Sequence, residues 1–395
     1  MTNRQLFLSH VAQTSTAPLL LEIERAEGMY MYDAAGKRYL DLISGISVSN
    51  LGHSHPAVVE AVKNQAEKYM HLMVYGELVE SPQVKFAKQI TDLLPASLHN
   101  VYFTNSGAEA TEGAMKLAKR ITGRSRFISF QNSYHGSTQG ALSLMGDEYF
   151  KQKFRPLLPD TLQLPYNRAS ELDKITCRTA AVFIEPVQAE SGITVPERAF
   201  MQALRQRCTD TGTLLVLDEA QTGLGRTGKM FAFEHFDIVP DILLLAKALG
   251  GGMPLGAFIA SRDRMATLSD NPVLGHITTF GGHPVSCAAG LAALQVTLRE
   301  NIVEAVEAKS RLFRQWLVHP AIRSVRSQGL MLSLQFDSYE QNKQIIDRCI
   351  SRGLLTDWFL FAPHCLRIAP PLLISEEEIK TACDIILQSI DASGS

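Results

Sequence analysis

The sequence predicts an α/β fold with a mostly parallel central sheet in a large domain, plus a smaller α+β domain. Short apolar runs such as Leu214–Leu217 and Ile242–Leu245 are flanked by turn residues, which is typical of strands buried on both faces of a parallel sheet. Stretches with apolar residues at helical spacing lie between such runs. From about Ala288 onward, helical stretches and alternating strands mix, which indicates the second domain.

The composition is that of an ordinary globular protein. The chain has 395 residues, of which 46% are hydrophobic, enough for a substantial core. A formal net charge of −2 without a block of Lys and Arg gives no reason to expect a nucleic-acid partner. The six cysteines are scattered without a CxxC spacing, which predicts reduced thiols in a cytoplasmic protein. No segment has the apolar length of a signal peptide or membrane span, so we expect no membrane partner.

The first hundred residues predict a hairpin and a helix. Met29–Asp33 is followed by a turn at Gly36, and Pro56 begins a stretch with apolar residues at helical spacing. His53 and His55 stand close together, but no acidic or cysteine ligand accompanies them. We therefore expect turn and packing roles for these histidines and no bound metal.

The next segment predicts an anion site at the start of a helix. A strand at Val101–Phe103 leads into a helical pattern, and Ser106 followed by Glu109 is a capping-box pattern. The free N–H groups at such a helix N-terminus bind anions, and Gly107 permits close approach. An ordinary helix cap is the alternative interpretation.

Two more strands deliver polar residues to loops. Phe127–Phe130 is followed by Tyr134, an aromatic that can stack on a flat ligand and exclude water. Ala180–Ile184 ends at Glu185, and Glu190 lies further along the same loop. By itself, Glu190 fits a solvated loop carboxylate.

The two central strands end in opposite charges, Asp218 and Lys247. Ligands of parallel sheets bind at the carboxyl ends of the strands. An acid and an amine there suit pyridoxal phosphate (PLP), because an acid keeps its ring nitrogen protonated and a lysine binds its aldehyde. The glycines at 250–252 let the backbone pass close to a bound group. A buried ion pair without chemistry is the alternative.

The C-terminal part predicts alternating helices and strands. The expected elements are helices from Ala288, at Val303–Trp316, at Gln341–Arg352 and from Glu376, with strands within Ser324–Phe336. Arg367 interrupts an apolar run, which is costly unless the charge is paired.

The motif LDEAQTGLGRTG, with AKALGGGMPLGA further along, resembles the signature of the class-III (subgroup II) PLP-dependent aminotransferases. The resemblance extends from about Leu40 to Ile374. It implies the fold-type I architecture of PLP-dependent transferases, with a large PLP-binding domain at 48–287 and a small domain built from 1–47 and 288–395. The nearest likeness is to acetylornithine and ornithine aminotransferases. Ile46 resembles the acetylornithine and 4-aminobutyrate types more than the ornithine δ-aminotransferases, which have a tyrosine there.

The resemblance also implies roles for individual residues. Lys247 is the catalytic lysine and Asp218 stabilises the protonated pyridine. The cofactor-binding residues expected around them are Ser106, Gly107 and Ala108 at the phosphate, Tyr134 on one ring face with Ala220 on the other, Gln221 at the 3′ oxygen, and Glu185 in the supporting network.

Four residues are expected to serve the substrate or the partner subunit. In relatives, the threonine matching Thr279 reaches a PLP phosphate in the other subunit's site, which implies a homodimer with shared active sites. Thr278 is expected near the substrate. The arginine matching Arg367 binds the α-carboxylate of glutamate, and the residue matching Glu190 pairs with that arginine when glutamate is absent. A purely structural ion pair is the alternative for Arg367.

The sequence departs from the family at Ser137. Many relatives that act on ornithine-like or 4-aminobutyrate-like substrates carry an arginine there to hold a substrate carboxylate, and a serine cannot supply its bidentate fork. We therefore expect an aminotransferase that moves an amino group between an ω-amino acid or amine, acetylornithine- or ornithine-like, and 2-oxoglutarate, with the donor left open. A PLP-dependent aminomutase or racemase on the same fold is the main alternative, and a non-catalytic binding protein is a second.

Overall fold

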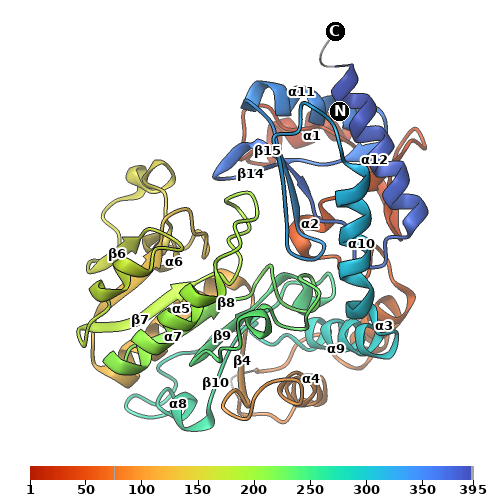
Figure 1. The fold of residues 1–395 in the computed structure, drawn as a ribbon. Coiled ribbons are helices and arrows are strands. Elements are labelled where there is room, and N and C mark those ends of the chain that lie inside the picture. Colours follow the sequence, from red (N-terminus) through yellow and green to blue (C-terminus); the bar gives the residue numbers. More distant parts are fainter. Residues whose placement is uncertain (75, 393–395) are drawn as a thin grey trace.

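A seven-stranded sheet forms the centre of the larger lobe in the computed structural model, which describes residues 1–74 and 76–392 (Figure 1). In spatial order its strands are β4 (Asn100–Thr104), β10 (Gly256–Ala260), β9 (Ile242–Leu245), β8 (Leu214–Asp218), β7 (Thr179–Ile184), β5 (Arg126–Phe130) and β6 (Thr161–Leu164). Strand β10 runs antiparallel to β4 and β9, whereas the pairs from β9 to β6 are parallel. The predicted mostly parallel sheet is confirmed.

Both faces of this sheet are covered, which explains the continuous apolar runs. Along β8, Leu215 and Leu217 join one hydrophobic cluster while Leu214 and Val216 join another, as the two-residue repeat of a strand requires. Helix α5 (Gly107–Thr122) packs into the second cluster and α7 (Arg198–Thr211) into the first. Burial on both faces fixes the strand register, so the polar strand ends all emerge at one edge.

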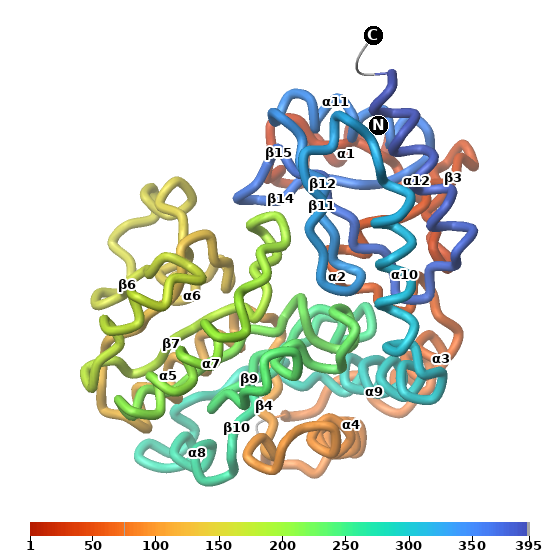
Figure 2. Tube along the Cα trace, viewed as in Figure 1, coloured from red at the N-terminus to blue at the C-terminus, as the bar shows by residue number. Residues whose placement is uncertain are grey.

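The smaller lobe is built from both chain ends, seen as red and blue elements side by side in Figures 1 and 2. Its two sheets contain, in spatial order, β1 (Ile23–Glu27), β2 (Tyr30–Asp33), β3 (Arg38–Asp41) and β13 (Leu354–Leu355), and then β11 (Ser324–Ser327), β12 (Leu332–Gln335), β15 (Ala362–Ile368) and β14 (Trp358–Phe359). The parallel pairing of β3 with β13 joins the two ends directly. The predicted β2–β3 hairpin is confirmed, with Gly36 at a positive φ of 82° in its turn.

The helices predicted from the sequence are present, and the structure adds others that were not predicted. Beyond α5 and α7 the helices are α1 (Asn3–His10), α2 (Ser44–Ser47), α3 (Pro56–Lys68), α4 (Ser81–Thr91), α6 (Gln139–Leu144), α8 (Arg262–Ala266), α9 (Pro284–Arg299), α10 (Ile302–Trp316), α11 (Tyr339–Ser351) and α12 (Glu376–Asp391). Helix α9 begins at Pro284, earlier than expected from the sequence. Short 3₁₀ helices also occur, of which η5 (Lys247–Gly250) matters for the site. None of the helices in the described residues combines the length and apolar character needed to cross a membrane.

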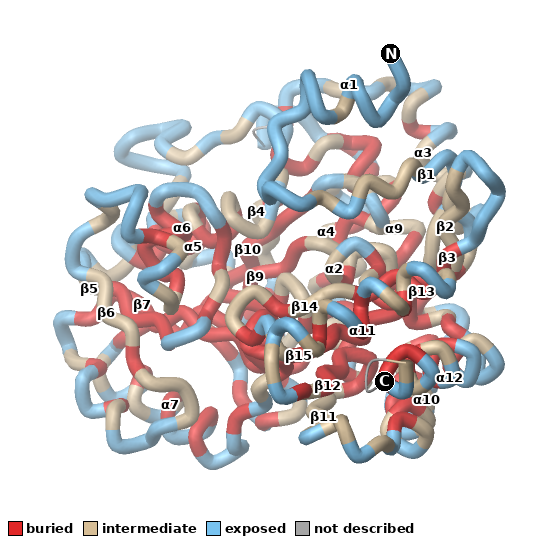
Figure 3. Tube along the Cα trace, turned by 90° about the horizontal axis from the view of Figure 1, so that it is seen from above, coloured by how far each residue is buried: buried red, intermediate tan, exposed pale blue. Residues whose placement is uncertain are grey.

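The division into domains at 48–287 and the two chain ends remains a prediction. A separate hydrophobic cluster supports it, because that cluster gathers residues from both ends, such as Leu40 and Ile386. The proposed boundary at 287 falls inside α9, which packs against both α3 and α4. Figure 3 shows the contrast between this buried interior and the exposed helix α1, which has no buried residue.

Candidate active site

Lys247 and Asp218 meet at the carboxyl edge of the central sheet. Asp218 is the last residue of β8, and Lys247 follows β9 as the first residue of η5. The backbone of Lys247 has a positive φ of 51°, an uncommon conformation for a residue with a side chain. Such strain concentrates at functional sites. Burial lowers the pKa of Lys247 despite the nearby carboxylates, and this favours the neutral amine that acts as a nucleophile.

A buried histidine holds Asp218 in place. His135 Nδ1 lies 2.8 Å from Asp218 Oδ2, and the Ala220 N–H donates to Asp218 Oδ1 over 3.0 Å. Burial alone lowers the pKa of His135, but the hydrogen bond and charge of Asp218 outweigh burial and raise it. The imidazole therefore favours its protonated form, and its hydrogen bond fixes the orientation of the Asp218 carboxyl group.

Glu185 lies behind this pair and supports Tyr134. The Tyr134 N–H donates to Glu185 Oε1 over 3.0 Å, and the Ala189 N–H donates to Oε2 over 3.3 Å. Burial raises the pKa of Glu185 to about 7. Glu185 thus positions the loop that carries the aromatic ring, and it is not among the residues that line the cavity beside Lys247.

The N-terminus of α5 opens into that cavity. Its volume is about 750 Å³, and its lining includes residues predicted to hold the cofactor, namely Ser106, Gly107, Ala108, Tyr134, Asp218, Ala220 and Lys247. Ser106 Oγ caps the helix by accepting from the Glu109 N–H. The reciprocal half of the predicted capping box is wrong: Glu109 Oε2 accepts from the Asn105 N–H at 2.7 Å, because Asn105 offers both its backbone and its side-chain amide.

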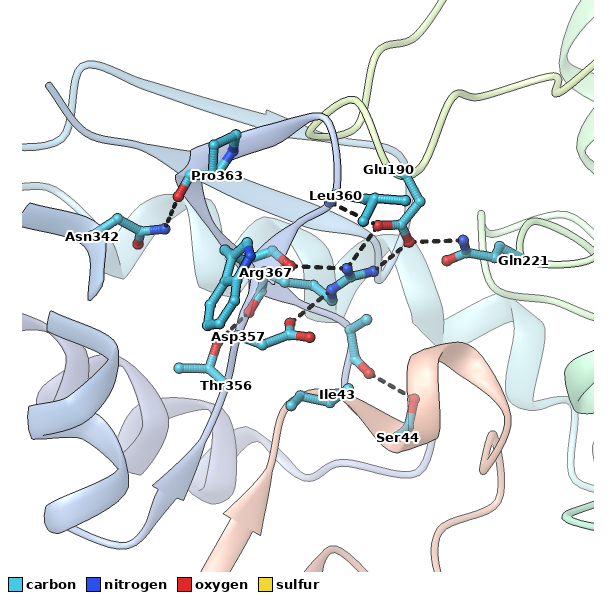
Figure 4. A network of polar contacts seen from close by, with 12 residues as sticks. Ile43, Ser44, Glu190, Gln221, Asn342, Thr356, Asp357, Leu360, Pro363 and Arg367 are labelled. Carbon is cyan, nitrogen blue, oxygen red and sulfur yellow. Dashed lines mark hydrogen bonds and ion pairs between the residues drawn. The ribbon is translucent and has the colours of Figure 1, made fainter. Parts of the chain in front are cut away.

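A second cavity of about 400 Å³ shares Tyr134 and Lys247 with the first and contains Arg367, Glu190 and Gln221. Arg367 Nη1 and Nη2 donate to the two oxygens of Glu190 at 2.9 and 3.0 Å (Figure 4). Although burial raises the pKa of Glu190, the charge of Arg367 lowers it to about 2. The expectation of a solvated loop carboxylate is therefore wrong, since Glu190 is only 7% exposed.

Gln221 contacts the ion pair of the second cavity. Its Nε2 donates to Glu190 Oε1 over 3.0 Å, so the amide supports the ion pair in the second cavity. It does not line the first cavity, where the 3′ oxygen of the cofactor was expected. The amide belongs to the Glu190 network in this structure, and its contact with a cofactor stays a prediction.

The two threonines lie outside both cavities of their own chain. Thr279 is exposed, whereas Thr278 Oγ1 accepts from Asn105 Nδ2 and from the Gly281 N–H, both at 3.0 Å. Thr278 therefore orders the loop that presents Thr279. Service to a partner subunit or to the substrate stays a prediction for both residues.

Sequence reasoning missed three residues of the site: Asn105, His135 and Asp357. Asn105 lines the first cavity, His135 pairs with Asp218, and Asp357 pairs with Arg367. A signal existed for His135, since it directly follows the predicted stacking aromatic after a buried strand. No comparable signal existed for Asp357, whose partner becomes visible only in the folded chain.

One of the two histidines near residue 53 has an acidic partner that is distant in sequence. His53 Nε2 lies 2.9 Å from Asp41 Oδ2, which ties the loop before α3 to the end of β3. Within the described residues, no group of three or more His, Cys, Asp or Glu side chains is arranged to hold a metal ion.

The residues around Lys247 fit PLP. The cavity combines a helix N-terminus for a phosphate, a buried carboxylate for a ring nitrogen, an amine of lowered pKa for an aldehyde and an aromatic side chain. A Cβ at Gly107 would lie 3.2 Å from Ala246 Cβ, so the close packing of this wall of the cradle favours glycine.

Sequence comparison gives the same answer over nearly the whole chain. The sequence model of the class-III aminotransferases matches residues 11–390. The chain belongs to the class-III aminotransferase family. Class-III aminotransferases depend on PLP, so this protein is a PLP-dependent transferase whose substrates are a small-molecule amino donor and an oxoacid. The predicted fold-type I architecture and cofactor are confirmed.

Individual relatives agree with this assignment. The chain is 41% identical to an acetylornithine aminotransferase of Methanopyrus kandleri, over 93% of this chain and 94% of that relative. The structure resembles ornithine aminotransferase of Toxoplasma gondii with a TM-score of 0.92 and 29% identity, covering 99% of this chain and 93% of that one. It also resembles an ω-transaminase of Pseudomonas jessenii with a TM-score of 0.93 and 25% identity, covering 100% and 98% of the two chains.

Proposed function

We propose that this class-III aminotransferase moves an amino group between an ω-amino acid or amine and the pair glutamate/2-oxoglutarate. The observation that carries the proposal is the buried Arg367–Glu190 ion pair in the cavity that shares Lys247 with the PLP cradle. A guanidinium fork facing the reacting lysine matches the carboxylate of an amino or oxo acid. The acetylornithine aminotransferases among the relatives support an ω-amine as the other substrate.

Lys247 is the proton carrier of the proposed reaction. Bound PLP supplies an electron sink for the negative charge left on a substrate carbon after proton removal. With its lowered pKa, the amine of Lys247 would accept the proton released at that substrate carbon and would later donate it back. Asp218, held in place by His135, would stabilise a protonated ring nitrogen. Tyr134 and Ala220 both line the cavity and would exclude water from the faces of a bound ring.

Arg367 and Glu190 serve the two substrates in turn. When glutamate or 2-oxoglutarate enters, its α-carboxylate replaces Glu190 on the arginine fork. When an ω-amine enters, Glu190 remains on Arg367, because an unpaired buried guanidinium would cost several kcal/mol. The Gln221 amide and the Leu360 N–H also hold Glu190 in this paired position, over 3.0 and 3.1 Å.

Replacement of the lysine tests the catalytic assignment. Lys247→Ala should abolish turnover and the borohydride-reducible link between PLP and protein, while phosphate contacts still retain PLP. Lys88→Ala is a matched control, because that lysine is 72% exposed and pairs with Asp92 on the surface. A reducible link that persists in Lys247→Ala would move the catalytic role to another lysine.

Single-turnover spectra of the two half-reactions test the substrate assignment. Arg367→Gln should mainly slow the half-reaction with glutamate. Glu190→Ala should favour glutamate and slow the ω-amine half-reaction relative to it. Arg367→Gln that reacts normally with glutamate, or Glu190→Ala that slows both half-reactions equally, contradicts the proposal. An amine panel with 2-oxoglutarate, read as glutamate formed, identifies the donor.

The same panel separates the aminomutase or racemase alternative. Such an enzyme would shift or epimerise an amino group without any added oxoacid and would form no glutamate. The guanidinium of Arg367 can bind the carboxylate of an amino-acceptor acid. An aminomutase or racemase does not require such an acid.

We also propose a homodimer in which Thr279 serves the partner's PLP phosphate. Thr279 is exposed beside exposed apolar side chains such as Ile277 and Phe280, as a residue in a subunit contact would be. Mixing Thr279→Ala with Lys247→Ala subunits would then yield heterodimers with one intact site. Activity that fails to recover after proven subunit exchange would assign Thr279 to its own subunit.

A further inference from the structure

The guanidinium of Arg367 has two edges with different partners. Its Nη1 and Nη2 face Glu190, whereas its Nε donates to Asp357 Oδ1 at 2.8 Å (Figure 4). Asp357 and Glu190 therefore bind opposite sides of one planar group. Only the Glu190 side belongs to the cavity that contains Lys247, since Asp357 is not among the residues lining it.

Two further contacts hold the same guanidinium in place, and they come from residues that do not line the cavity. Arg367 Nη2 donates to the Trp358 backbone oxygen at 3.1 Å, and the ring of Phe359 lies 4.5 Å from the guanidinium carbon. Both residues belong to β14, which pairs with β15, the strand that carries Arg367. Arg367 and Asp357 are also joined through their backbones, because the backbone N–H of Arg367 donates to the backbone oxygen of Asp357 at 2.9 Å. These contacts do not depend on Glu190.

We infer that Asp357 is a positioning residue that keeps Arg367 aimed at the cavity while Glu190 is displaced by the carboxylate of glutamate or 2-oxoglutarate. The inference rests on the proposed function of Arg367 and adds the device that keeps its fork in place. When Glu190 leaves, Arg367 loses two of its contacts and retains those with Asp357 and the Trp358 oxygen. Without Asp357, the long side chain would have one hydrogen bond left and could turn away from the incoming acid.

The charge arrangement supports a division of labour between the two acids. The bidentate contact of Glu190 lowers its pKa to about 2, whereas burial and the other nearby carboxylates raise the pKa of Asp357. Asp357 is a single-oxygen partner whose side chain is 26% exposed. Glu190 thus makes the stronger contact but stands where a substrate must bind, while Asp357 stands where no substrate competes for the arginine.

Isotope exchange between glutamate and labelled 2-oxoglutarate tests this role without knowledge of the ω-amine. In Asp357→Asn holoenzyme, the KM for both acids should rise about tenfold, as expected for loss of one charge-assisted hydrogen bond. The value of kcat should stay within about twofold, because Lys247 and Asp218 are untouched. Binding of glutarate, a dicarboxylate that cannot react, should weaken by the same factor.

Asp337→Asn is the matched control, because Asp337 forms a bidentate pair with Arg323 on the surface of the same lobe. That variant should leave both KM values unchanged. Asp357→Ser also lacks the carboxylate and has a smaller side chain. It replaces Asp357→Asn in the test if that variant does not fold.

The outcomes are separable. Unchanged or lower KM values and unchanged glutarate binding in the Asp357 variants, with normal exchange in the wild type, would overturn the positioning role alone. Equal losses in kcat and PLP absorbance with no KM effect would assign Asp357 a structural role and likewise overturn the inference. Absence of exchange in the wild type would overturn the proposed acceptor and, with it, this role for Asp357.

Discussion

Two buried arginines, Arg226 and Arg367, lie where the lobes meet, and their partners give them opposite roles. Arg367 is 4% exposed and binds the carboxylates of Glu190 and Asp357. Arg226 is fully buried, and no carboxylate in the described part of the chain lies within ion-pair distance of it. Burial lowers the pKa of Arg226 to about 9, whereas the acids around Arg367 outweigh burial and raise the pKa of that group.

The partners of Arg226 are fixed parts of the framework. Its Nη1 donates to the backbone oxygens of Leu330, at 3.1 Å, and Pro370, and its Nη2 donates to Asn50 Oδ1 at 2.6 Å and Ser44 Oγ at 3.3 Å. Backbone carbonyls cannot leave when a substrate arrives. Arg226 therefore fastens the loop of the large lobe to the small lobe, whereas Arg367 has a side-chain partner, Glu190, that a substrate would replace in the proposed function.

This fastening reaches the active site through the segment that contains Ser44. Ser44 Oγ also donates to the Ala369 oxygen at 2.7 Å, and the next residues, Gly45 and Ile46, line the cavity of Arg367. Ile46 has a positive φ of 63°, which is costly for a β-branched residue, whereas Gly45 adopts its φ of 62° without such a cost. Burial alone therefore does not identify a functional arginine. In the proposed function, Arg367 differs from Arg226 because a substrate carboxylate can replace one of its partners.

The largest expected effect is on stability. Arg226→Gln leaves the Leu330 and Pro370 carbonyls without a donor, and each unsatisfied buried group costs about 1–3 kcal/mol, so we expect the free energy of unfolding to fall by about 3–5 kcal/mol. Urea unfolding measures this loss. Arg323→Gln, at an exposed ion pair, should lose far less stability. Equal losses in the two variants would contradict the framework role of Arg226.

A double-mutant cycle sharpens the comparison. Arg367→Gln combined with Glu190→Gln should show a coupling energy of about 2–3 kcal/mol, because the second change removes the carboxylate that the first leaves unpaired. Arg226→Gln combined with Asn50→Ala should couple by less than about 1 kcal/mol, since Asn50 is uncharged and is one of four hydrogen-bond partners of Arg226, two of which are backbone oxygens. Similar coupling energies in the two cycles would show that the arginines do not differ in kind.

The stability of the folded protein at low pH should depend on the Glu190–Arg367 pair. The pKa of Glu190 is lowered from 4.5 to about 2 in the folded protein, so its stabilising contribution is present above pH 4.5 and is lost as pH falls toward 2. The slope is at most about 1.4 kcal/mol per pH unit for one such group, which gives about 2 kcal/mol between pH 4.5 and pH 3. Glu190→Gln should flatten this acid limb of the stability curve, whereas Arg226→Gln should keep it. An unchanged slope in Glu190→Gln would contradict the ion pair.

The smallest expected effect comes from adding an arginine at an exposed edge of the site. Ser137 is exposed, lines the cavity beside Lys247 and lies 3.1 Å from the Tyr134 hydroxyl through its Oγ. Ser137→Arg should raise kcat/KM for N-acetylornithine by about tenfold, through a new bidentate contact with its α-carboxylate. Ser137→Gln has similar polarity without the charge and should produce no such gain. A gain in both variants would exclude the carboxylate contact as the cause.

The sequence by itself determined the central sheet and the chemistry at its edge. Two-faced apolar runs that end in Asp218 and Lys247 predict parallel strands delivering an acid and an amine to one place, because strand ends are local in sequence. Ser106 at the start of α5 was predictable for the same reason, since a helix cap depends on residues that are close together in sequence.

Only the tertiary structure decided which distant groups became partners. Asp357 joins Arg367 because it directly precedes β14, which pairs with the strand that carries Arg367, and Gln221 donates to Glu190 from a loop far away in sequence. Arg226 carries no sequence signal of its burial, because its partners are backbone oxygens more than a hundred residues away, at Leu330 and Pro370. A residue's own type limits what it can bind, but which group satisfies it in a dry interior depends on how the lobes pack.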